Sequence, residues 1–402
     1  MKKIAYICEP QMGGTYTSFR QVRERLLPRG IDYRCVPPFD KQAFQATRFA
    51  KDEGVDFIDF PENDPAGMAR RLVRHLQEAQ FSGMVVLPGC YPFVSGLPAF
   101  LPREIRCIAR MPHNARGVYV PTALMAEHYN RVVAVSPRLK SDLVSKYGVP
   151  PAKVVVIGNG VDTDRLYPGE GAPGHRAVFV GRLEDVQKNV FLLPKILARA
   201  ATLDPEAHLT VVGSGPDAER LRERFSALGL GDRVELLGRV DSAEIPGILR
   251  RHGVFLLPSR FEGCSNSTLE AMACGCVPIL SRLPGISDQL VVHGRSGFLF
   301  PPDDWKGMGD AWGRLARSEE IGRPMQAAAR ERMVSGFSLD RMADGYARLF
   351  ESVLAEPDSR PAANPLDEFS IHPALGSTWR RWIPEPVKKR LRSWAARVGM
   401  SP

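Results

Sequence analysis

The sequence contains no apolar stretch that approaches the ~18 consecutive residues of a transmembrane helix. Its first apolar run, at residues 4–8, stops at Glu9-Pro10 and is too short for the hydrophobic part of a signal peptide. We therefore expect this run to form a first β-strand. Together these two absences predict a cytoplasmic protein.

Cysteine is scarce, with seven residues scattered over 402 positions. Cys274 and Cys276 lack the two-residue gap of a redox or zinc motif, and no second pair answers them. Several of the others lie in apolar runs, where cysteine behaves as a small hydrophobic residue. We expect free thiols in a reducing compartment and no metal site.

The overall composition is ordinary for a globular protein, with 44% hydrophobic and 25% charged residues. These fractions exclude a largely disordered chain, a collagen-like fibre and a coiled coil. A chain of 402 residues is also too long for one ordinary core. Its length predicts two domains of ~150–200 residues each.

Positive charge is concentrated at the carboxyl end. Residues 377–402 hold seven basic residues and one acidic residue, and so carry +6 of the net charge of +9. Because the remainder is nearly neutral, we expect no broad nucleic-acid-binding surface and no nucleic-acid partner.

The same basic segment also holds three of the five tryptophans, Trp379, Trp382 and Trp394. Within it Val387, Leu391, Trp394 and Val398 form a narrow apolar stripe opposite a basic face. Two interpretations stay open. The segment either lies peripherally on the inner face of a membrane, attracted to anionic lipid, or packs on the body of the protein.

Short β-rich segments alternate with helical patterns, which is typical of an α/β protein with parallel sheets. In the first half we expect strands at 4–8, 33–36, 55–58, 84–87, 105–109, 132–135 and 154–157, and helices at 17–27, 65–80 and 137–147. After a Gly- and Pro-rich linker at 169–174, we expect strands at 177–180, 209–212, 234–237, 254–257, 277–280 and 297–300. Helices are expected at 190–201, 217–228, 243–250, 267–273, 305–316, 320–334 and 339–354.

This alternation predicts two doubly wound parallel-sheet domains, at residues 1–168 and 175–340, with a ligand in the cleft between their strand carboxyl ends. We expect residues 341–357 to form a helix that returns toward the first domain. Residues 358–402 are then a basic, Trp-containing extension. We expect the polar, proline-bearing residues 357–373 to form an irregular strap.

A dense group of small and polar residues lies at 258–278. It follows an apolar segment and enters a predicted helix, and such a junction presents free backbone N–H groups to an anion. Glu262 precedes the helix, and Glu270 lies about one turn inside it. Because two carboxylates would repel a phosphate, we expect them to hold hydroxyl groups, of a sugar on one side and of a ribose on the other.

Two further motifs lie at the ends of predicted strands. Gly181 ends the first strand of the second domain, and Arg182 and Lys188 follow it. A guanidinium and an ammonium there can neutralise a diphosphate, one as a fork and one as a point charge. The turn at 212–216, which contains Gly213 and Gly215, suits the close approach of a nucleotide, although such turns are common.

With these residues the chain resembles a family-4 retaining glycosyltransferase of the GT-B fold. The resemblance covers about residues 1–355 and is strongest in the second domain, where order and spacing both fit. The matching residues are Gly13-Gly14, His113, Val156-Ile-Gly-Asn-Gly-Val-Asp162, Gly181-Arg182, Lys188, Gly213-Ser-Gly-Pro216 and the Glu262-x7-Glu270 block, which ends in Glu-Ala-Met-Ala-Cys-Gly275. It implies two Rossmann-like domains that face an interdomain cleft.

The resemblance also implies roles for individual side chains. Arg182 and Lys188 would hold the diphosphate of a nucleotide-sugar donor and stabilise it as the leaving group. Glu270 would accept hydrogen bonds from the ribose, Glu262 would contact hydroxyls of the donor sugar, and His113 would touch the sugar near its 6-position. Implied donor contacts, largely through the backbone, lie at Gly13, Gly14, Gly213, Gly215, Arg239, Val240, Cys264, Ser265, Asn266 and Ser267.

The implied reaction is retaining and metal-independent, and it needs no cofactor. Preorganised cations and a helix end would stabilise the leaving UDP or GDP. The acceptor hydroxyl would belong to a carbohydrate or a lipid-linked molecule, as in envelope polysaccharide assembly. Asp162-Thr-Asp164 spells a metal-binding pattern of other glycosyltransferases, but here it belongs to a turn near the linker.

Some positions depart from the family pattern. Family members often carry Phe and Gly where this chain has Cys264 and Ser265, which would alter sugar preference. The spacing from Arg182 to Lys188 is one residue longer than in many relatives. Two alternatives to the transferase stay open, namely a GT-B-fold sugar-nucleotide epimerase and a catalytically silent nucleotide-sugar-binding subunit.

Overall fold

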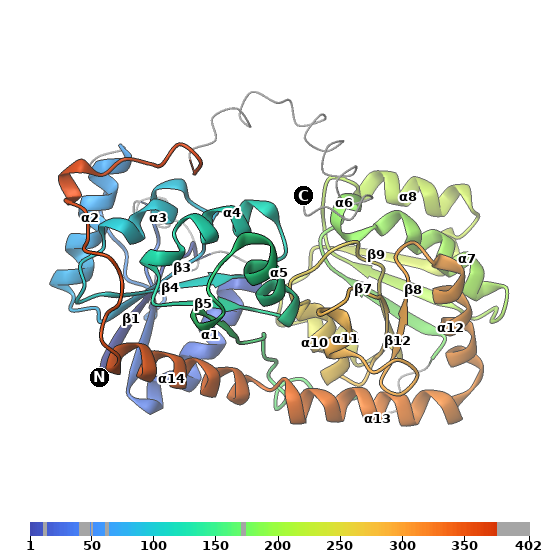
Figure 1. The fold of residues 1–402 in the computed structure, drawn as a ribbon. Coiled ribbons are helices and arrows are strands. Elements are labelled where there is room, and N and C mark those ends of the chain that lie inside the picture. The colour runs from blue at the N-terminus through green and yellow to red at the C-terminus, as the bar shows by residue number, and fades with distance from the viewer. Residues whose placement is uncertain (11–13, 40–48, 50, 61–63, 170–173, 376–402) are drawn as a thin grey trace. The chain divides into compact units, whose positions relative to one another are not determined.

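The structure is a computed structural model that describes residues 1–10, 14–39, 49, 51–60, 64–169 and 174–375. These residues fall into two compact units. Unit 1 holds the residues up to Asn159 together with those from Leu339 onward, and unit 2 is Gly160–Ser338. Each unit is an α/β fold around its own six-stranded sheet, so the predicted fold class is confirmed (Figure 1).

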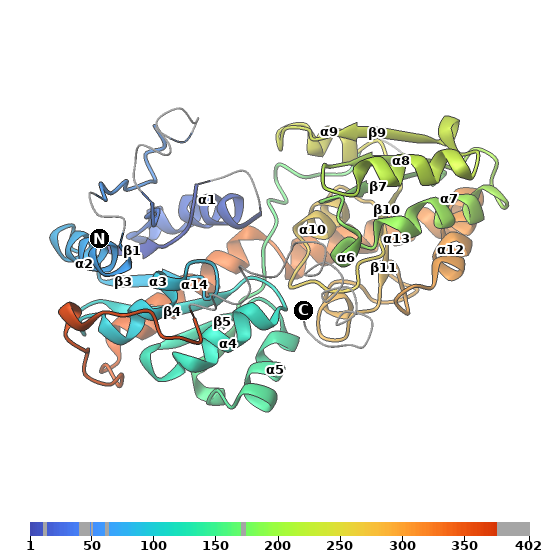
Figure 2. The same ribbon diagram turned by 90° about the horizontal axis from the view of Figure 1, so that it is seen from above.

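The sheet of unit 1 is parallel and has the strand order β2-β1-β3-β4-β5-β6. Its strands are β1 (Lys2–Tyr6), β2 (Ile31–Cys35), β3 (Gly83–Val86), β4 (Arg106–Met111), β5 (Arg131–Ala134) and β6 (Val154–Val156). Its helices are α1 (Gly14–Leu26), α2 (Pro65–Glu78), α3 (Pro92–Gly96), α4 (Arg116–Leu124), α5 (Pro137–Tyr147) and α14 (Leu339–Ala355). In Figures 1 and 2, α1 and α14 cover one face of this sheet, and α2, α3 and α4 cover the other.

The face under α1 and α14 is an aromatic core. Period-2 alternation places Ile4, Tyr6 and Cys8 in this core. The ring of Tyr6 stacks on Phe19 of α1 at 5.6 Å, and rings from β2 and α14 continue the cluster. Helix α14 therefore completes the core of unit 1, although it follows unit 2 in the sequence.

One of the buried charged residues of unit 1 lies in its central sheet. Arg110 of β4 is 4% exposed, and its guanidinium donates to the hydroxyl of Tyr346 at 2.9 Å and to the side-chain oxygen of Asn159 at 2.9 Å. A buried charge is tolerated when its donors are satisfied in this way. Arg110 thus ties α14 and the end of the first chain segment to the centre of the sheet.

After α14 the chain runs over unit 1 as the expected irregular strap, with a single 3-10 turn at Leu366–Glu368. Arg360 is 3% exposed and donates to Asp358 at 2.8 Å and to the carbonyl of Ile105 at 3.0 Å. Asn130 also donates to Asp358 at 2.8 Å. These charge-assisted bonds hold the pKa of Asp358 down at about 2, against the opposing effect of its burial.

The sheet of unit 2 is also parallel and has the order β12-β11-β10-β7-β8-β9. Its strands are β7 (Arg176–Val180), β8 (His208–Val212), β9 (Val234–Gly238), β10 (Val254–Leu257), β11 (Val277–Ser281) and β12 (Phe298–Phe300). Its helices are α6 (Asp185–Lys188), α7 (Leu193–Ala201), α8 (Ala218–Ala227), α9 (Ile245–Leu249), α10 (Asn266–Ala273), α11 (Ser287–Leu290), α12 (Trp305–Arg317) and α13 (Glu319–Gly336). Helix α7 packs with α8 and α12, and α10 packs with α9 and α13.

The main error in the expected elements concerns residues 55–58, which form no strand. Val55 makes only an isolated bridge to Cys35 at the edge of the sheet. Val55 and Ile58 are nevertheless 7% and 1% exposed. Their apolar character therefore reflects burial against unit 1 rather than strand pairing. Helices α3 and α4, which contain Pro92 and Pro121, were also missed.

Candidate functional site

The strand order of unit 2 creates a switch point between β7 and β10. The two strands are parallel neighbours, with Val254 opposite Ala177. The strand that follows β7 is β8, toward one edge of the sheet, and the strand that follows β10 is β11, toward the other edge. Ligands of open α/β sheets bind at the carboxyl ends of the strands at such a point. Here that edge carries the loop after β7, with Arg182 and Lys188, and the loop after β10, with Glu262.

The structure joins two of the predicted residues directly. Lys188 Nζ lies 2.7 Å from Glu262 Oε1, although the residues are 74 positions apart. Their side chains are 13% and 9% exposed, and Ser259 Oγ donates to the same carboxylate oxygen at 2.7 Å. This pairing was not expected from the sequence, which assigned the two residues to different parts of a ligand.

Arg182 stands apart from this buried pair. Its side chain is 67% exposed, and its Nε lies 3.4 Å from Glu184 Oε2. An exposed pair of this kind stabilises a fold little, so the arginine is available at small cost to an anion. Of the two predicted cations at this edge, Lys188 is buried and Arg182 is exposed.

Helix α10 begins beside these loops, and its first turn contains several predicted contacts. Ser265 is the N-cap, and its Oγ accepts from the backbone N–H of Thr268 at 3.3 Å. Asn266 and Ser267 follow in the first turn, and Cys264, just before it, is partly exposed. The remaining N–H groups of this turn and the helix dipole favour an anion.

Glu270 lies one turn inside α10, as predicted. Burial raises the pKa of its carboxyl to about 7, while the charge of Arg165 acts in the opposite direction. The two carboxylates therefore lie in different electrostatic environments. Among the described residues, Glu262 has a cation at hydrogen-bond distance and Glu270 has none. Near neutral pH, Glu270 is poised between its two protonation states.

The glycine turn after β8 packs against the loop after β7. Gly213 has φ +139°, and a Cβ built there would lie 1.8 Å from the carbonyl oxygen of Gly181. A Cβ on Gly215 would lie 2.3 Å from the carbonyl oxygen of Leu183. The missing side chains thus make room for protein backbone, and the close approach of a nucleotide at these glycines stays a prediction.

The other predicted positions lie at the same kind of edge in their own units. Arg239 and Val240 follow β9, with Arg239 exposed and Val240 partly buried. In unit 1, His113 follows β4 and is partly exposed, and Gly14 begins α1. Gly13 lies outside the described residues. The roles of all of these residues remain predictions.

The residues that tie the two loops together were missed in the sequence. They are Asp185, Gln187 and Arg260, which join the loop after β7 to the loop after β10, and Asp217, whose carboxylate accepts from the backbone N–H of Asp185 at 2.9 Å. All four lie in or next to motifs that the sequence analysis singled out. Their partners are distant in the chain, so no spacing rule could have paired them.

In the Asp162-Thr-Asp164 turn, the carboxylate of Asp162 is used in hydrogen bonds to the backbone of the turn itself. The carboxylate of Asp162 accepts from the N–H groups of Asp164 at 3.2 Å and of Arg165 at 3.1 Å. In the described part of the chain, no group of three or more His, Cys, Asp or Glu residues is placed to hold a metal ion. None of the described helices is long and apolar enough to cross a membrane.

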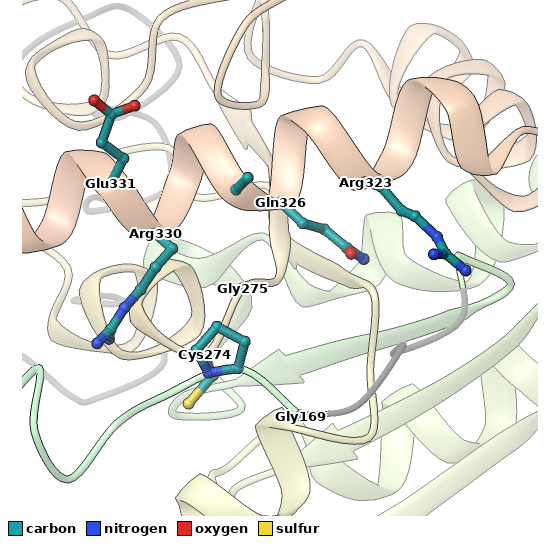
Figure 3. A pocket seen from close by; sticks show the side chains of 9 residues that line it. Gly169, Cys274, Gly275, Arg323, Gln326, Arg330 and Glu331 are labelled. Carbon is teal, nitrogen blue, oxygen red and sulfur yellow. The ribbon is translucent and has the colours of Figure 1, made fainter.

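A cavity of about 430 Å³ lies elsewhere in unit 2, between α13 and the segments at Gly169 and Cys274 (Figure 3). It lies beside Gly275, just before β11 begins, and therefore toward the amino ends of the strands. Arg330 points from α13 toward this segment, where it donates to the carbonyls of Thr163 at 2.7 Å and Ala273 at 2.9 Å. Its guanidinium is thus used to hold backbone, and the cavity contains none of the predicted donor residues.

We predict that Gly213→Ala destabilises the protein by about 2–4 kcal/mol, because the new Cβ meets backbone at a strained φ. Denaturant unfolding would measure the change. Gly231→Ala is the matched control, since no atom lies within 4 Å of its added Cβ, and it should change stability by less than about 0.5 kcal/mol. An unchanged midpoint for Gly213→Ala would contradict the packing described above.

Family models match both halves of the chain. Residues 12–165 match the model described as Glycosyltransferase Family 4, and residues 174–318 match the model described as Glycosyl transferases group 1. The second match contains the whole switch-point edge of unit 2.

Named relatives cover only part of this chain. This chain is 28% identical over 245 residues to the GDP-mannose:cellobiosyl-diphosphopolyprenol alpha-mannosyltransferase of Xanthomonas campestris. The aligned region covers 60% of this chain and 63% of the relative. This chain is 32% identical over 164 residues to a phosphatidylinositol N-acetylglucosaminyltransferase subunit of Arabidopsis thaliana, which covers 40% and 36%. The chain thus spans less than two thirds of the length of these relatives.

Solved structures of low identity share the fold. A sucrose-phosphate synthase from Thermosynechococcus elongatus matches with a TM-score of 0.73 at 19% identity, covering 88% of this chain and all of the other. Anabaena HepE in complex with UDP-glucose matches with a TM-score of 0.72 at 16% identity and the same coverage. With both family matches and this fold, the chain belongs to the family-4 glycosyltransferases of the GT-B fold.

Proposed function

We propose that the protein is a retaining, metal-independent glycosyltransferase that moves a sugar from a UDP- or GDP-linked donor to an acceptor hydroxyl. The observation that supports this most is the arrangement at the switch point of unit 2. A buried Lys188–Glu262 pair, an exposed Arg182 and the first turn of α10 share the edge where such sheets bind nucleotides.

Each group has a task in this reaction. Arg182 and Lys188 neutralise the diphosphate as the bond between the sugar carbon and the phosphate oxygen breaks. The amide N–H groups at the start of α10 add a fixed positive potential that needs no reorganisation during the reaction. Glu262 keeps Lys188 in place and accepts hydrogen bonds from sugar hydroxyls, while ionised Glu270 accepts them from the ribose.

The proton balance requires no carboxylate nucleophile. The acceptor oxygen bonds to the sugar carbon on the face from which the diphosphate leaves, and the departing phosphate oxygen takes the acceptor proton. The products are the glycoside, with its anomeric configuration retained, and the protonated nucleoside diphosphate. Positive charge at the leaving group is supplied by side chains, so a metal ion is not needed.

The proposed acceptor is a carbohydrate or a lipid-linked molecule. The Xanthomonas relative is named for a cellobiosyl-diphosphopolyprenol, and the Arabidopsis relative is named for phosphatidylinositol. The basic, Trp-containing segment at 377–402 lies outside the described residues, and its composition suits contact with an anionic membrane.

We predict that one of UDP, GDP and ADP, or its common sugar conjugate, stabilises the protein in a thermal-shift titration with or without EDTA. At 100 times its Kd a ligand adds about 2.7 kcal/mol, which raises Tm by several degrees. Arg182→Ala should remove most of this shift without changing the Tm of the unliganded protein, because its side chain is exposed. Arg222→Ala is the matched control, since it removes an arginine of similar exposure on α8.

The same titration separates the alternatives. A shift abolished by EDTA would contradict the metal-free site, and no shift with any nucleotide would contradict the proposed donor site. A shift without any hydrolysis or transfer of the donor would favour a silent subunit. With the donor known, Glu262→Gln should retain nucleotide binding but lose the slow hydrolysis of the donor. Recovery of a donor inverted at a ring carbon would instead indicate an epimerase.

We predict that donor affinity rises with pH between 6 and 8. The ribose contact uses the ionised form of Glu270, whose pKa is about 7, so protonation at lower pH weakens binding. With a pKa near 7 only about a tenth of the carboxyl is ionised at pH 6, and the Kd should rise several-fold to tenfold. Calorimetric titration with the nucleotide sugar, whose phosphates do not titrate in this range, would measure it.

The control for the pH effect is Glu270→Gln, which should bind more weakly than wild type at pH 8 and show a flat profile from pH 6 to 8. A wild-type profile that is itself flat, or an unchanged slope in Glu270→Gln, would contradict the assignment of Glu270 to the ribose.

We predict that the protein binds vesicles containing anionic lipid and that replacing Trp379, Trp382 and Trp394 with Ser releases it. Insertion of the indole rings supplements the electrostatic attraction of the basic residues. Co-sedimentation would measure binding, with neutral phosphatidylcholine vesicles as the lipid control and an unchanged Tm as the control for folding. Unchanged binding by the triple variant would contradict the membrane proposal.

A further inference from the structure

Arg260 joins the two loops that carry Lys188 and Glu262 of the proposed donor site, but it is not one of the predicted site residues. It is two positions before Glu262 in the loop after β10, and its side chain is 15% exposed. Its guanidinium Nη1 donates to the carbonyl oxygen of Asp185 and lies 3.3 Å from Asp185 Oδ2. Its Nη2 lies 3.8 Å from Asp303 Oδ1 in the segment after β12. Arg260, which itself follows β10, therefore contacts the segments that follow two other strands, β7 and β12.

The backbone of the same residue continues this connection. The N–H of Arg260 donates to the carbonyl of Gln187 at 2.9 Å, and Gln187 Nε2 reaches the carbonyl of Phe261 at 3.5 Å. Gln187 immediately precedes Lys188, and Phe261 immediately precedes Glu262. The two loops thus run together up to the Lys188–Glu262 pair.

Asp185 is the point on the first loop to which Arg260 is fixed. Its backbone N–H donates to Asp217 at 2.9 Å, and its Oδ1 accepts from the N–H of Phe191 at 3.0 Å. Helix α6 begins at Asp185 and ends at Lys188 after four residues. Because a single helical turn is not stable by itself, these tertiary contacts decide where Lys188 lies.

Asn189, directly after Lys188, is held by Asp303, which Arg260 also contacts. It has φ +54°, and its Nδ2 donates to Asp303 Oδ1 at 2.8 Å. Asp303 is thus shared between Arg260 and Asn189. The segment on both sides of Lys188 is therefore anchored to groups that Arg260 also contacts.

We propose that Arg260 is a positioning residue that places Lys188 against the leaving diphosphate through Asp185 and Asp303, without contacting the donor. This inference rests on the proposed function. The guanidinium of Arg260 is directed to Asp185 and Asp303, whereas that of Arg182 is exposed beside Glu184. A misplacement of about 1 Å in a catalytic group can cost a factor of about 100 in rate.

The test measures hydrolysis or transfer of the donor, with UDP-glucose and GDP-mannose as the first probes, by release of the nucleoside diphosphate. Arg260→Ala should lower kcat about 10- to 100-fold. Arg199→Ala is the matched control, since it removes an arginine of unit 2 that pairs with Asp310 at 2.6 Å between α7 and α12, and it should stay within about twofold of wild type.

A double-variant comparison separates positioning from a general loss of structure. If Arg260 acts through Lys188, then Arg260→Ala should cost less than about twofold in kcat once Lys188 is replaced by Met. A full additional loss in the Lys188→Met background would overturn the proposal, because Arg260 would then act elsewhere. If Arg260→Ala does not fold, Arg260→Lys serves instead, since an ammonium cannot reproduce the guanidinium fork and should give an intermediate loss that Lys188→Met again removes.

The outcome distinguishes this inference from the function on which it rests. Wild-type kcat in Arg260→Ala, with activity lost in Arg182→Ala, would overturn the positioning role alone. If Arg182→Ala and Lys188→Met both keep wild-type turnover, the proposed donor site itself is wrong.

Discussion

The ion pair between Lys188 and Glu262 is the interaction on which the proposed site depends. Two charged side chains that are about 10% exposed are stable only as partners, because a buried charge without its counterion is strongly unfavourable. The pair therefore constrains the loops after β7 and β10 to meet. Once they meet, the first turn of α10 and Arg182 lie along the same strand edge, and the proposed diphosphate site consists largely of backbone N–H groups together with Arg182 and Lys188.

The close packing of the loops around the pair depends on glycines as well as on side-chain contacts. Gly213 and Gly215 let the turn after β8 lie against the carbonyls of Gly181 and Leu183. Asp217 then holds the N–H of Asp185, and Arg260 holds its carbonyl. Three strand ends are thus fastened to one another before any ligand is considered, which is the rigidity that electrostatic stabilisation of a leaving group requires.

Unit 1 is built on a different constraint, because its core is closed by a late part of the chain. Tyr346 and Phe350 of α14 pack on the ring of Tyr33, and Tyr346 also accepts the hydrogen bond of the buried Arg110. The strap then adds Asp358 and Arg360 to the same unit. Unit 1 consequently lacks part of its core and a partner of a buried guanidinium until residues after 339 are in place.

Much of the strand and helix pattern could be predicted, because buried parallel strands are short apolar runs and their helices are amphipathic. Helix α5 was predicted with its exact bounds, and Glu262 and Glu270 were placed correctly relative to α10. Residues 55–58 failed because an apolar run shows burial and does not show whether a strand partner is available. Helix α4 failed because Pro121 interrupts the local signal.

By itself the sequence determined the two-sheet α/β class, the approximate position of most strands and the chemical kinds of group that follow them. Those features are local, since periodicity, glycine turns and charged residues are all read within a few positions. The tertiary structure alone decided that Lys188 pairs with Glu262, that Arg260 ties three strand ends, that the glycine turn faces backbone, and that α14 closes unit 1. Each of these joins residues tens to hundreds of positions apart, and such partners are selected by burial and packing, which no local pattern encodes.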